Sequence, residues 1–319
     1  MNLFIDTNVF LSFYHLTNDD LEELRKLSVL IDKGKIHLIL PRQVINEFKR
    51  NRESKISDSL KKLNEQKTNP QFPQICKDYP EYKELRDQQS RYLKSHSELM
   101  QKLSEDIKNR NLKADIIIQE LFEKASIIET TNETIEKART RMAIGNPPGK
   151  KGSFGDAINW ETLLKTVDEN NDVHFVADDK DYYSLLDDQS FNDFLLAEWK
   201  ENKKAELYCY RRLSTFFNDH FPHIKLASEI EKEILITELA SSDSFRSTHG
   251  TVEKLSKYSD FTIAQIDAIL LAAIDNRQVR WIINDDDVKE FITAIISGKE
   301  ERLNVDNLDR IKDMLKETD

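Results

Sequence analysis

Carboxylates recur along this chain where an expected strand ends or an expected helix begins. One follows the apolar run 2–5, two follow the apolar run 173–177, and two lie near the starts of expected helices. These five acidic residues are Asp6, Glu47, Asp156, Asp178 and Asp179. Gathered in one place, their negative charges would repel one another, and burial would add a desolvation cost. The pattern therefore indicates a site for a divalent cation.

The ligand types indicate which cation such a site would hold. Oxygen ligands without a nearby histidine or cysteine favour Mg²⁺ or Mn²⁺ over zinc. Such a cation lowers the pKa of a bound water, and the same or a second cation neutralises charge on a phosphate and on its leaving oxygen. The chemistry predicted from these residues is hydrolysis of a phosphodiester by in-line attack. The 7 histidines show no ligand spacing, and we assign no role to them.

Each acidic residue also has a plainer interpretation. Asp6 can belong to an ordinary turn, Glu47 can be a solvated helix residue, and Asp156 can cap the start of a helix. One or two of the carboxylates after 173–177 can cap the helix that follows. A further acidic run, 285–287, is interpreted as the start of a helix rather than as a second metal site.

The elements that would position these carboxylates follow an alternating order. The apolar runs 2–5, 36–40 and 173–177 predict buried strands, a further strand is expected at 206–210, and helical patterns such as 18–33 lie between them. This alternation is typical of an α/β fold with a parallel sheet flanked by helices. Open sheets of this kind gather functional residues at the carboxyl ends of their strands. The fold would therefore bring the acidic residues together.

Two regions depart from this alternation. Between about 55 and 144 apolar residues recur at helical spacing among many charges, so we expect a long helical hairpin inserted into the α/β domain. Pro222 marks a boundary between a first domain, 1–221, and a mostly helical C-terminal domain, 222–319. Within the second domain, Val279–Ile283 is expected to be a strand.

Composition limits the classes to which the protein can belong. Of 319 residues, 33% are charged and the net charge is −11, which argues against a uniformly basic nucleic-acid binder. The 16 phenylalanines and 9 tyrosines exclude wholesale disorder. Cys76 and Cys209 have no paired spacing, which excludes thiolate zinc sites and points to a reducing compartment. With no apolar run near the roughly 18 residues of a membrane span and no predicted signal peptide, we expect a cytoplasmic protein without membrane contact.

Basic residues are unevenly distributed along the chain. One group follows Glu47 by about a turn, and a second leads into the loop before Asp156. Both groups can hold phosphates near the cation and offset the negative net charge, or they can be ordinary solvated charges. The candidate nucleic-acid contacts are Asn8, Lys49, Arg50, Arg139, Arg141, Lys150 and Lys151.

Four segments, in order along the chain, resemble the motifs of PIN-domain nucleases. Residues 3–8 (Leu-Phe-Ile-Asp-Thr-Asn) are similar to the opening motif, and 44–48 (Val-Ile-Asn-Glu-Phe) to the second. The prolines and glycine at 147–149, followed by 155–160, resemble the third motif of a bacterial PIN-like branch, and 176–182 resembles the fourth. The resemblance covers the first domain apart from the helical insertion.

The resemblance implies a parallel α/β fold, metal-dependent RNA cleavage and a set of ligands. Asp179 corresponds to the principal acid of the fourth motif, Asp178 to the residue before it, and Asp181 to a frequent third acid. Many relatives have Ser or Thr where this chain has Ala177, so a hydroxyl that assists their site is absent here. The implied catalytic residues are Asp6, Glu47, Asp156 and Asp179, and the implied metal ligands are these four with Asp178 and Asp181.

Three functions are open at this point. The favoured one is a Mg²⁺- or Mn²⁺-dependent endoribonuclease in a toxin-like or antiviral role. The second is a DNA-directed nuclease, because a tall helical insertion could thread a single strand. The third is a catalytically idle module that binds nucleic acid or regulates, for which Ala177 is the support. The insertion and 222–319 are expected to select substrate, bind a protein partner or pair with a second copy.

Overall fold

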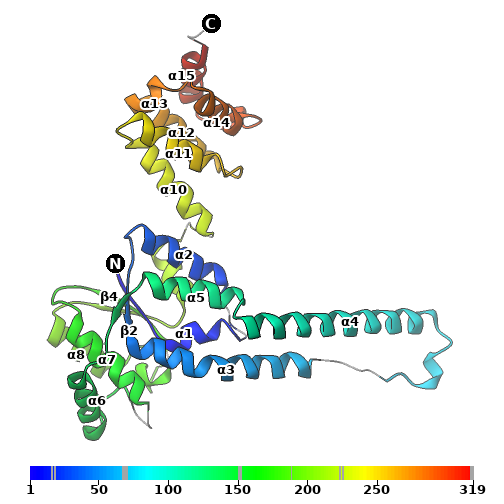
Figure 1. The fold of residues 1–319 in the computed structure, drawn as a ribbon, viewed down its shortest axis with the longest axis vertical. Helices are drawn as coiled ribbons and strands as arrows, with labels where there is room; N and C mark the ends of the chain where they lie inside the picture. Colours follow the sequence, from blue (N-terminus) through cyan, green and yellow to red (C-terminus); the bar gives the residue numbers. More distant parts are fainter. Residues whose placement is uncertain are drawn as a thin grey trace. The chain divides into compact units, whose positions relative to one another are not determined.

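The computed structural model separates the chain into two compact units, Met1–His223 and Ile224–Asp319 (Figure 1). We describe each unit by itself. The structure describes residues 1–15, 17, 19–66, 71–149, 153–187, 189–222, 224 and 226–316.

The first unit is built on a five-stranded sheet in which every pair of neighbouring strands is parallel. The strands are β1 (Asn2–Ile5), β2 (His37–Pro41), β3 (Ser126–Ile128), β4 (Val173–Val176) and β5 (Leu207–Tyr210). Their order across the sheet is β3-β2-β1-β4-β5, so the strand order reverses between β1 and β4. Open α/β sheets bind ligands at such a switch point, beyond the carboxyl ends of the strands.

Helices flank the sheet, which confirms the predicted fold class. They are α1 (Thr7–Ser12), α2 (Leu21–Asp32), α3 (Arg42–Glu65), α5 (Lys113–Lys124), α6 (Asn132–Ile144), α7 (Phe154–Thr166), α8 (Asp193–Lys203) and α9 (Leu213–His220), with a short 3₁₀ helix, η3 (Lys180–Tyr182). The core contains fully buried aromatic side chains, among them Phe4 of β1, Phe175 of β4 and Trp160 of α7.

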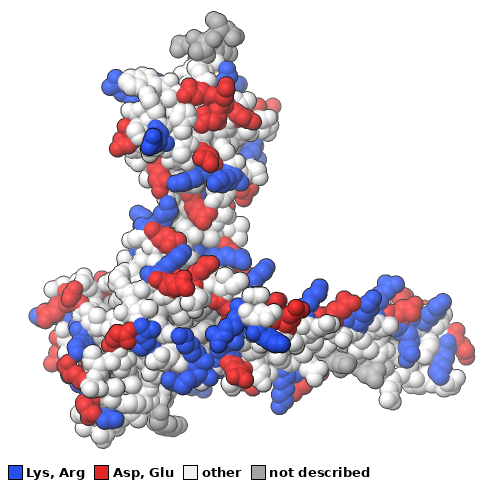
Figure 2. Space-filling model, in the orientation of Figure 1, with Lys and Arg blue, Asp and Glu red and all other residues white. Residues whose placement is uncertain are grey.

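The helical insertion is shorter than the sequence predicted. Figure 1 shows α4 (Pro80–Asn109) extending beside the distal half of α3, and the imidazole of His96 lies 3.0 Å from the carbonyl oxygen of Leu63. The predicted range 55–144, however, also contains β3, α5 and α6, and β3 pairs with β2 in the sheet. A three-residue strand is too short to produce a periodic signal, which explains the difference. On the face shown in Figure 2, acidic and basic side chains alternate along this hairpin.

The second unit is helical, with its own hydrophobic core. Its elements are α10 (Ala227–Ala240), α11 (Phe245–Leu255), α12 (Ile263–Asp275), α13 (Arg277–Trp281), α14 (Asp286–Ile296), η4 (Glu300–Arg302) and α15 (Val305–Lys316). The expected strand Val279–Ile283 is wrong, because Asn276 caps a helix there by accepting a hydrogen bond from the amide of Gln278 at 2.8 Å. Val279, Ile282 and Ile283 are buried in a helical core, whereas Trp281 is exposed. A short apolar run fits either a strand or a helix.

Two chemical expectations also concern the whole chain. Both cysteines are free thiols in the structure. Among the described residues, no helix combines the length and the apolar character needed to cross a membrane.

Candidate metal centre

Asp6 stands where β1 ends and α1 begins. Its amide donates to the carbonyl of Val176 at 2.8 Å, so the ladder between β1 and β4 continues up to this residue. Its carboxylate caps α1 by accepting from the amide of Asn8 at 3.1 Å, and the residue is 1% exposed. Asp6 is therefore a helix cap rather than part of an ordinary turn, and the same geometry places a buried carboxylate at the switch point of the sheet.

Asp179 is fixed from both sides of the switch point. One carboxylate oxygen accepts from the amide of Asp181 at 3.0 Å, which caps the 3₁₀ helix η3. The other accepts from the side-chain amide of Asn8 at 3.1 Å. Asn8, predicted as a nucleic-acid contact, is therefore the residue that ties the end of β1 to the end of β4 and orients Asp179.

Asp156 reaches the same place from α7. The helix begins at Phe154, so Asp156 lies in its first turn and is not the cap that the sequence allowed. The Ser153 hydroxyl donates to one oxygen of Asp156, and the Tyr182 hydroxyl lies 3.4 Å from the other. Ligand oxygens of Asp156, Asp179 and Asp181 lie within 4.8 Å of one another. Residues from two separate parts of the sequence, α7 and the segment after β4, thus offer oxygen ligands to one point.

Glu47 approaches this group from α3. The side-chain amide of Gln43 lies 3.5 Å from its carboxylate. A Cβ atom placed on Gly155 would lie only 2.8 Å from Oε2 of Glu47, so the carboxylate rests against the bare backbone at the start of α7. The glycine at position 155 is needed for this close approach.

The electrostatics of the group show strong crowding of negative charge. Burial raises the pKa of Asp6 well above its usual value, and the nearby charge of Asp156 raises it further. Burial also raises the pKa of Asp156, to about 7, and raises the pKa of Glu47. Each carboxyl would bind a proton more readily than usual because the charged form is both desolvated and repelled. An all-oxygen group with this excess of negative charge fits a divalent cation.

Asp178 does not join this group. It is exposed, and its carboxylate forms an ion pair with Arg211 at 3.0 Å. Adjacent residues of an extended segment point to opposite sides, so Asp178 faces a neighbouring pocket while Asp179 faces Asp156. The sequence could not distinguish these two directions.

The predicted basic contacts are scattered by the fold. Arg141 is buried, with its guanidinium bonded to Glu161 and Glu198, so it stabilises the packing of α6 and is shielded from a phosphate. Arg139 is exposed and pairs with Glu136 on its own helix. Both arginines lie on α6, and only the packing of that helix shows which of them is buried.

The remaining basic candidates fall in three places. Arg50 is exposed and close enough to Glu47 to oppose the rise in its pKa. Lys49 lines a different pocket, together with Arg52. Lys150 and Lys151 lie outside the described residues.

Sequence reasoning missed several residues of the site. Tyr182, which contacts Asp156, and Gly155, over which Glu47 lies, stood within the motif segments without an assigned role. Ser153, which also contacts Asp156, lies between the two parts of the third motif. The spacing of Ser153, three residues before Asp156 at a helix start, was an available signal. No sequence signal linked Arg211 to Asp178, because they are paired only by the neighbouring strands β4 and β5.

Comparison with known proteins gives one match. Residues 3–182 match a family model described as PIN domain. This span contains the described carboxylate group and the strands β1 to β4. Searches of curated proteins and of solved structures found no match.

Proposed function

The chain belongs to the PIN-domain family, and from this premise we propose that it is an endoribonuclease dependent on Mg²⁺ or Mn²⁺. A PIN domain is a nuclease fold whose activity is usually metal-dependent, and its substrate is nucleic acid. The observation that carries the proposal is the meeting of Asp156, Asp179 and Asp181 beside Asp6 and Glu47. RNA as the substrate, and a toxin-like or antiviral role, follow from the resemblance of the four motifs.

The residues of this chain have distinct parts in the proposed reaction. Asp156, Asp179 and Asp181 would hold the cation, with Asp6 and Glu47 completing its negative surroundings. When bound, a divalent cation lowers the pKa of water and neutralises charge on the phosphate. Ser153 and Asn8 hold the carboxylates of Asp156 and Asp179 in place before any cation arrives. Such outer partners lower the cost of assembling the site.

Glu47 has properties that suit a proton acceptor. It is half-buried, and its raised pKa lies nearer to neutrality than that of an ordinary glutamate. A carboxylate with a raised pKa takes a proton from water more readily at neutral pH. We propose that Glu47 serves as a cation ligand or as the acceptor of that proton.

The regions outside the carboxylate group complete the proposal. The α3–α4 hairpin and the unit Ile224–Asp319 are proposed to select the substrate, bind a protein partner or pair with a second copy. A cytoplasmic site of action is proposed from the use of only two cysteines, both free.

The decisive experiment is cleavage of labelled single-stranded RNA and DNA of matched sequence, each with Mn²⁺, Mg²⁺ or EDTA. Wild type is compared with Asp6→Asn and Asp179→Asn after circular dichroism has shown that both variants are folded. We expect RNA to be cut in the presence of metal and both variants to lose the activity.

Each other outcome changes a specific part of the proposal. Preferential cutting of DNA would show that DNA, and not RNA, is the substrate. Cutting that survives EDTA or both substitutions would show that the clustered carboxylates take no part in the reaction. Binding of RNA with no cutting under any metal would make the protein an idle binding module, in line with the alanine at position 177.

A further inference from the structure

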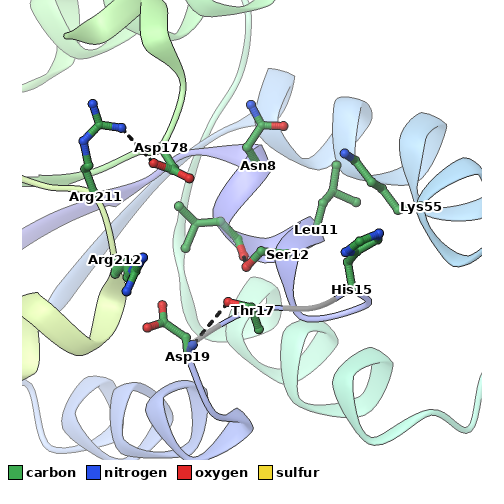
Figure 3. Close-up of a pocket in the computed structure, with 11 residues that line it drawn as sticks. Asn8, Leu11, Ser12, His15, Thr17, Asp19, Lys55, Asp178, Arg211 and Arg212 are labelled. Carbon is green, nitrogen blue, oxygen red and sulfur yellow. Dashed lines mark hydrogen bonds and ion pairs between the residues drawn. The ribbon is translucent and has the colours of Figure 1, made fainter. Parts of the chain in front are cut away.

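A pocket of about 370 Å³ adjoins the carboxylate group (Figure 3). Its volume lies within the range of small-ligand sites. Asn8 and Asp178 line it, and both are connected to Asp179: Asn8 donates a hydrogen bond to its carboxylate at 3.1 Å, and Asp178 precedes it in the chain. The pocket therefore begins within one residue of the proposed cation ligands.

Cations surround this pocket from distant parts of the sequence. Figure 3 shows Lys55 of α3 on one side and Arg211 and Arg212, which follow β5, on the other. The guanidinium carbon of Arg211 lies 3.9 Å from the ring centroid of Tyr183, and its ion pair with Asp178 holds it from a second direction. A guanidinium held in this way loses little conformational freedom when it binds an anion.

The acidic residues of the lining are already engaged. Asp19 accepts from the amide of Leu213 at 3.1 Å and from the hydroxyl of Ser214 at 2.5 Å, so it serves as a cap for α9. Asp178 is paired with Arg211. The described lining has three Lys and Arg side chains and these two carboxylates, so positive charges outnumber negative ones there, although the net charge of the chain is −11.

We propose that this pocket binds a phosphate of the nucleic-acid strand beside the phosphate that is cleaved. The inference rests on the proposed function, since it assigns a second contact for the same substrate. The described lining contains no Phe, Tyr or Trp on which a base could stack, whereas its cations and the hydroxyl of Ser12 suit an oxyanion. The oxyanion can belong to an internal phosphodiester or to a terminal 5′-phosphate.

The test measures binding in EDTA, where cleavage does not interfere. The full-length chain is titrated with fluorescent single-stranded RNA at several salt concentrations, with Lys55→Gln, Arg212→Gln and the matched control Lys94→Gln. Lys94 lies on α4, its side chain is 79% exposed, and it is absent from the pocket lining. We expect each pocket variant to bind about tenfold more weakly. The slope of log K against log salt should fall by about 0.7 for each lost phosphate contact.

Two RNA probes distinguish the sources of the phosphate. One carries a 5′-hydroxyl and the other a 5′-phosphate, at the same length and sequence. If the pocket holds an internal phosphodiester, the substitutions weaken the binding of both probes equally. If it holds a terminal phosphate, only the 5′-phosphorylated probe binds less tightly to the variants.

Charge-retaining variants separate binding from folding. Lys55→Arg and Arg212→Lys should bind within about twofold of wild type if the charge is what matters. The proposal is overturned if these two lose as much affinity as the glutamine variants, or if the glutamine variants bind like Lys94→Gln with an unchanged salt slope. If the pocket variants bind like wild type and wild type still cuts RNA, the pocket proposal fails and the nuclease proposal is unaffected. If binding depends on the pocket but no RNA is cut, only the nuclease proposal fails.

Discussion

Two acidic runs in this chain look alike in sequence and differ in structure. Asp179 and Asp181, which follow β4, meet Asp156 within 4.8 Å. The run 285–287, at the start of α14, is exposed at every position, and Asp285 and Asp287 pair with His249 at 3.3 and 2.7 Å. A run of aspartates therefore makes a candidate metal site only where other elements bring further carboxylates to it.

The difference arises from the elements that carry the two runs. Neighbouring parallel strands end at one edge, so residues after β1 and β4 are forced together, and α3 and α7 supply Glu47 and Asp156. At the start of α14, by contrast, the acidic side chains are exposed to solvent, and two of them pair with His249. Their negative charges also interact favourably with the helix dipole. This confirms the interpretation of 285–287 as a helix start.

The largest expected effect separates the two runs by activity. Asp156→Asn should lower metal-dependent cleavage by on the order of 10²-fold or more, because it removes a carboxylate proposed to hold the cation that neutralises charge on the reacting phosphate. Asp286→Asn makes the same chemical change in the exposed run and should leave the rate within a factor of two. Initial rates on labelled RNA would measure both. Equal losses in the two variants would contradict the comparison.

A second prediction concerns the close approach of Glu47 to the backbone. Gly155→Ala places a Cβ atom against the carboxylate of Glu47 and the amide of Gln43, which are flexible ends that can move. We therefore expect the fold to persist while Mn²⁺ affinity falls by about tenfold, the usual cost of disturbing a ligand's surroundings. Isothermal titration with Mn²⁺ would show this. Gly298→Ala in the second unit, a glycine with open space around it but a positive φ of 73°, should leave Mn²⁺ affinity unchanged.

A third prediction concerns the free-energy cost of holding several carboxylates together in the folded protein. The pKa of Asp156 is about 7 in the folded protein, against a usual value of 3.8, so the folded state holds a proton that the unfolded chain releases between these values. Stability should fall as pH rises through this window, and the loss is complete above it. Asp156→Asn should therefore raise the Tm of the first unit in EDTA at pH 8 by several degrees, since about 1 kcal/mol corresponds to roughly 2–4 °C.

Calorimetry at two pH values, with and without Mn²⁺, would test that prediction. The gain in Tm should vanish as the pH falls below 3.8, where the wild-type carboxyl becomes protonated in the unfolded as well as the folded state. Added Mn²⁺ should raise the Tm of wild type and have much less effect on the variant. A variant that melts below wild type in EDTA at pH 8 would show that the carboxylate group is not a source of strain.

The smallest effect is expected at the exposed run. His249→Ala removes both ion pairs, but the side chains of His249, Asp285 and Asp287 are 37–52% exposed. Exposed pairs contribute about 0–1 kcal/mol, so the Tm of the second unit should change by no more than a few degrees. RNA cleavage should be unchanged. A large loss of cleavage in this variant would assign a function to the second acidic run.

Much of the first unit could be predicted because its signals are local. Four of the five strands correspond to apolar runs that the sequence placed within a residue or two, and strand–helix alternation implied parallel pairing. β3 was not predicted because three residues are too few to show periodicity. α13 was mistaken for a strand because a short apolar run fits both a strand and a helix. The structure also gives Asn8 a further part, since its side chain orients the carboxylate of Asp179, and it places Arg141 in a buried position between two glutamates.

The sequence by itself determined which residue types were available and where the strands would end, since both depend on neighbours along the chain. Only the tertiary structure decided that Asp179 faces Asp156 while Asp178 faces Arg211, and that Lys55 and Arg212 line one pocket although 157 positions separate them. The direction in which a side chain points, and which side chains meet, depend on how strands pair and helices pack. Those contacts join residues far apart in sequence, and no local pattern records them.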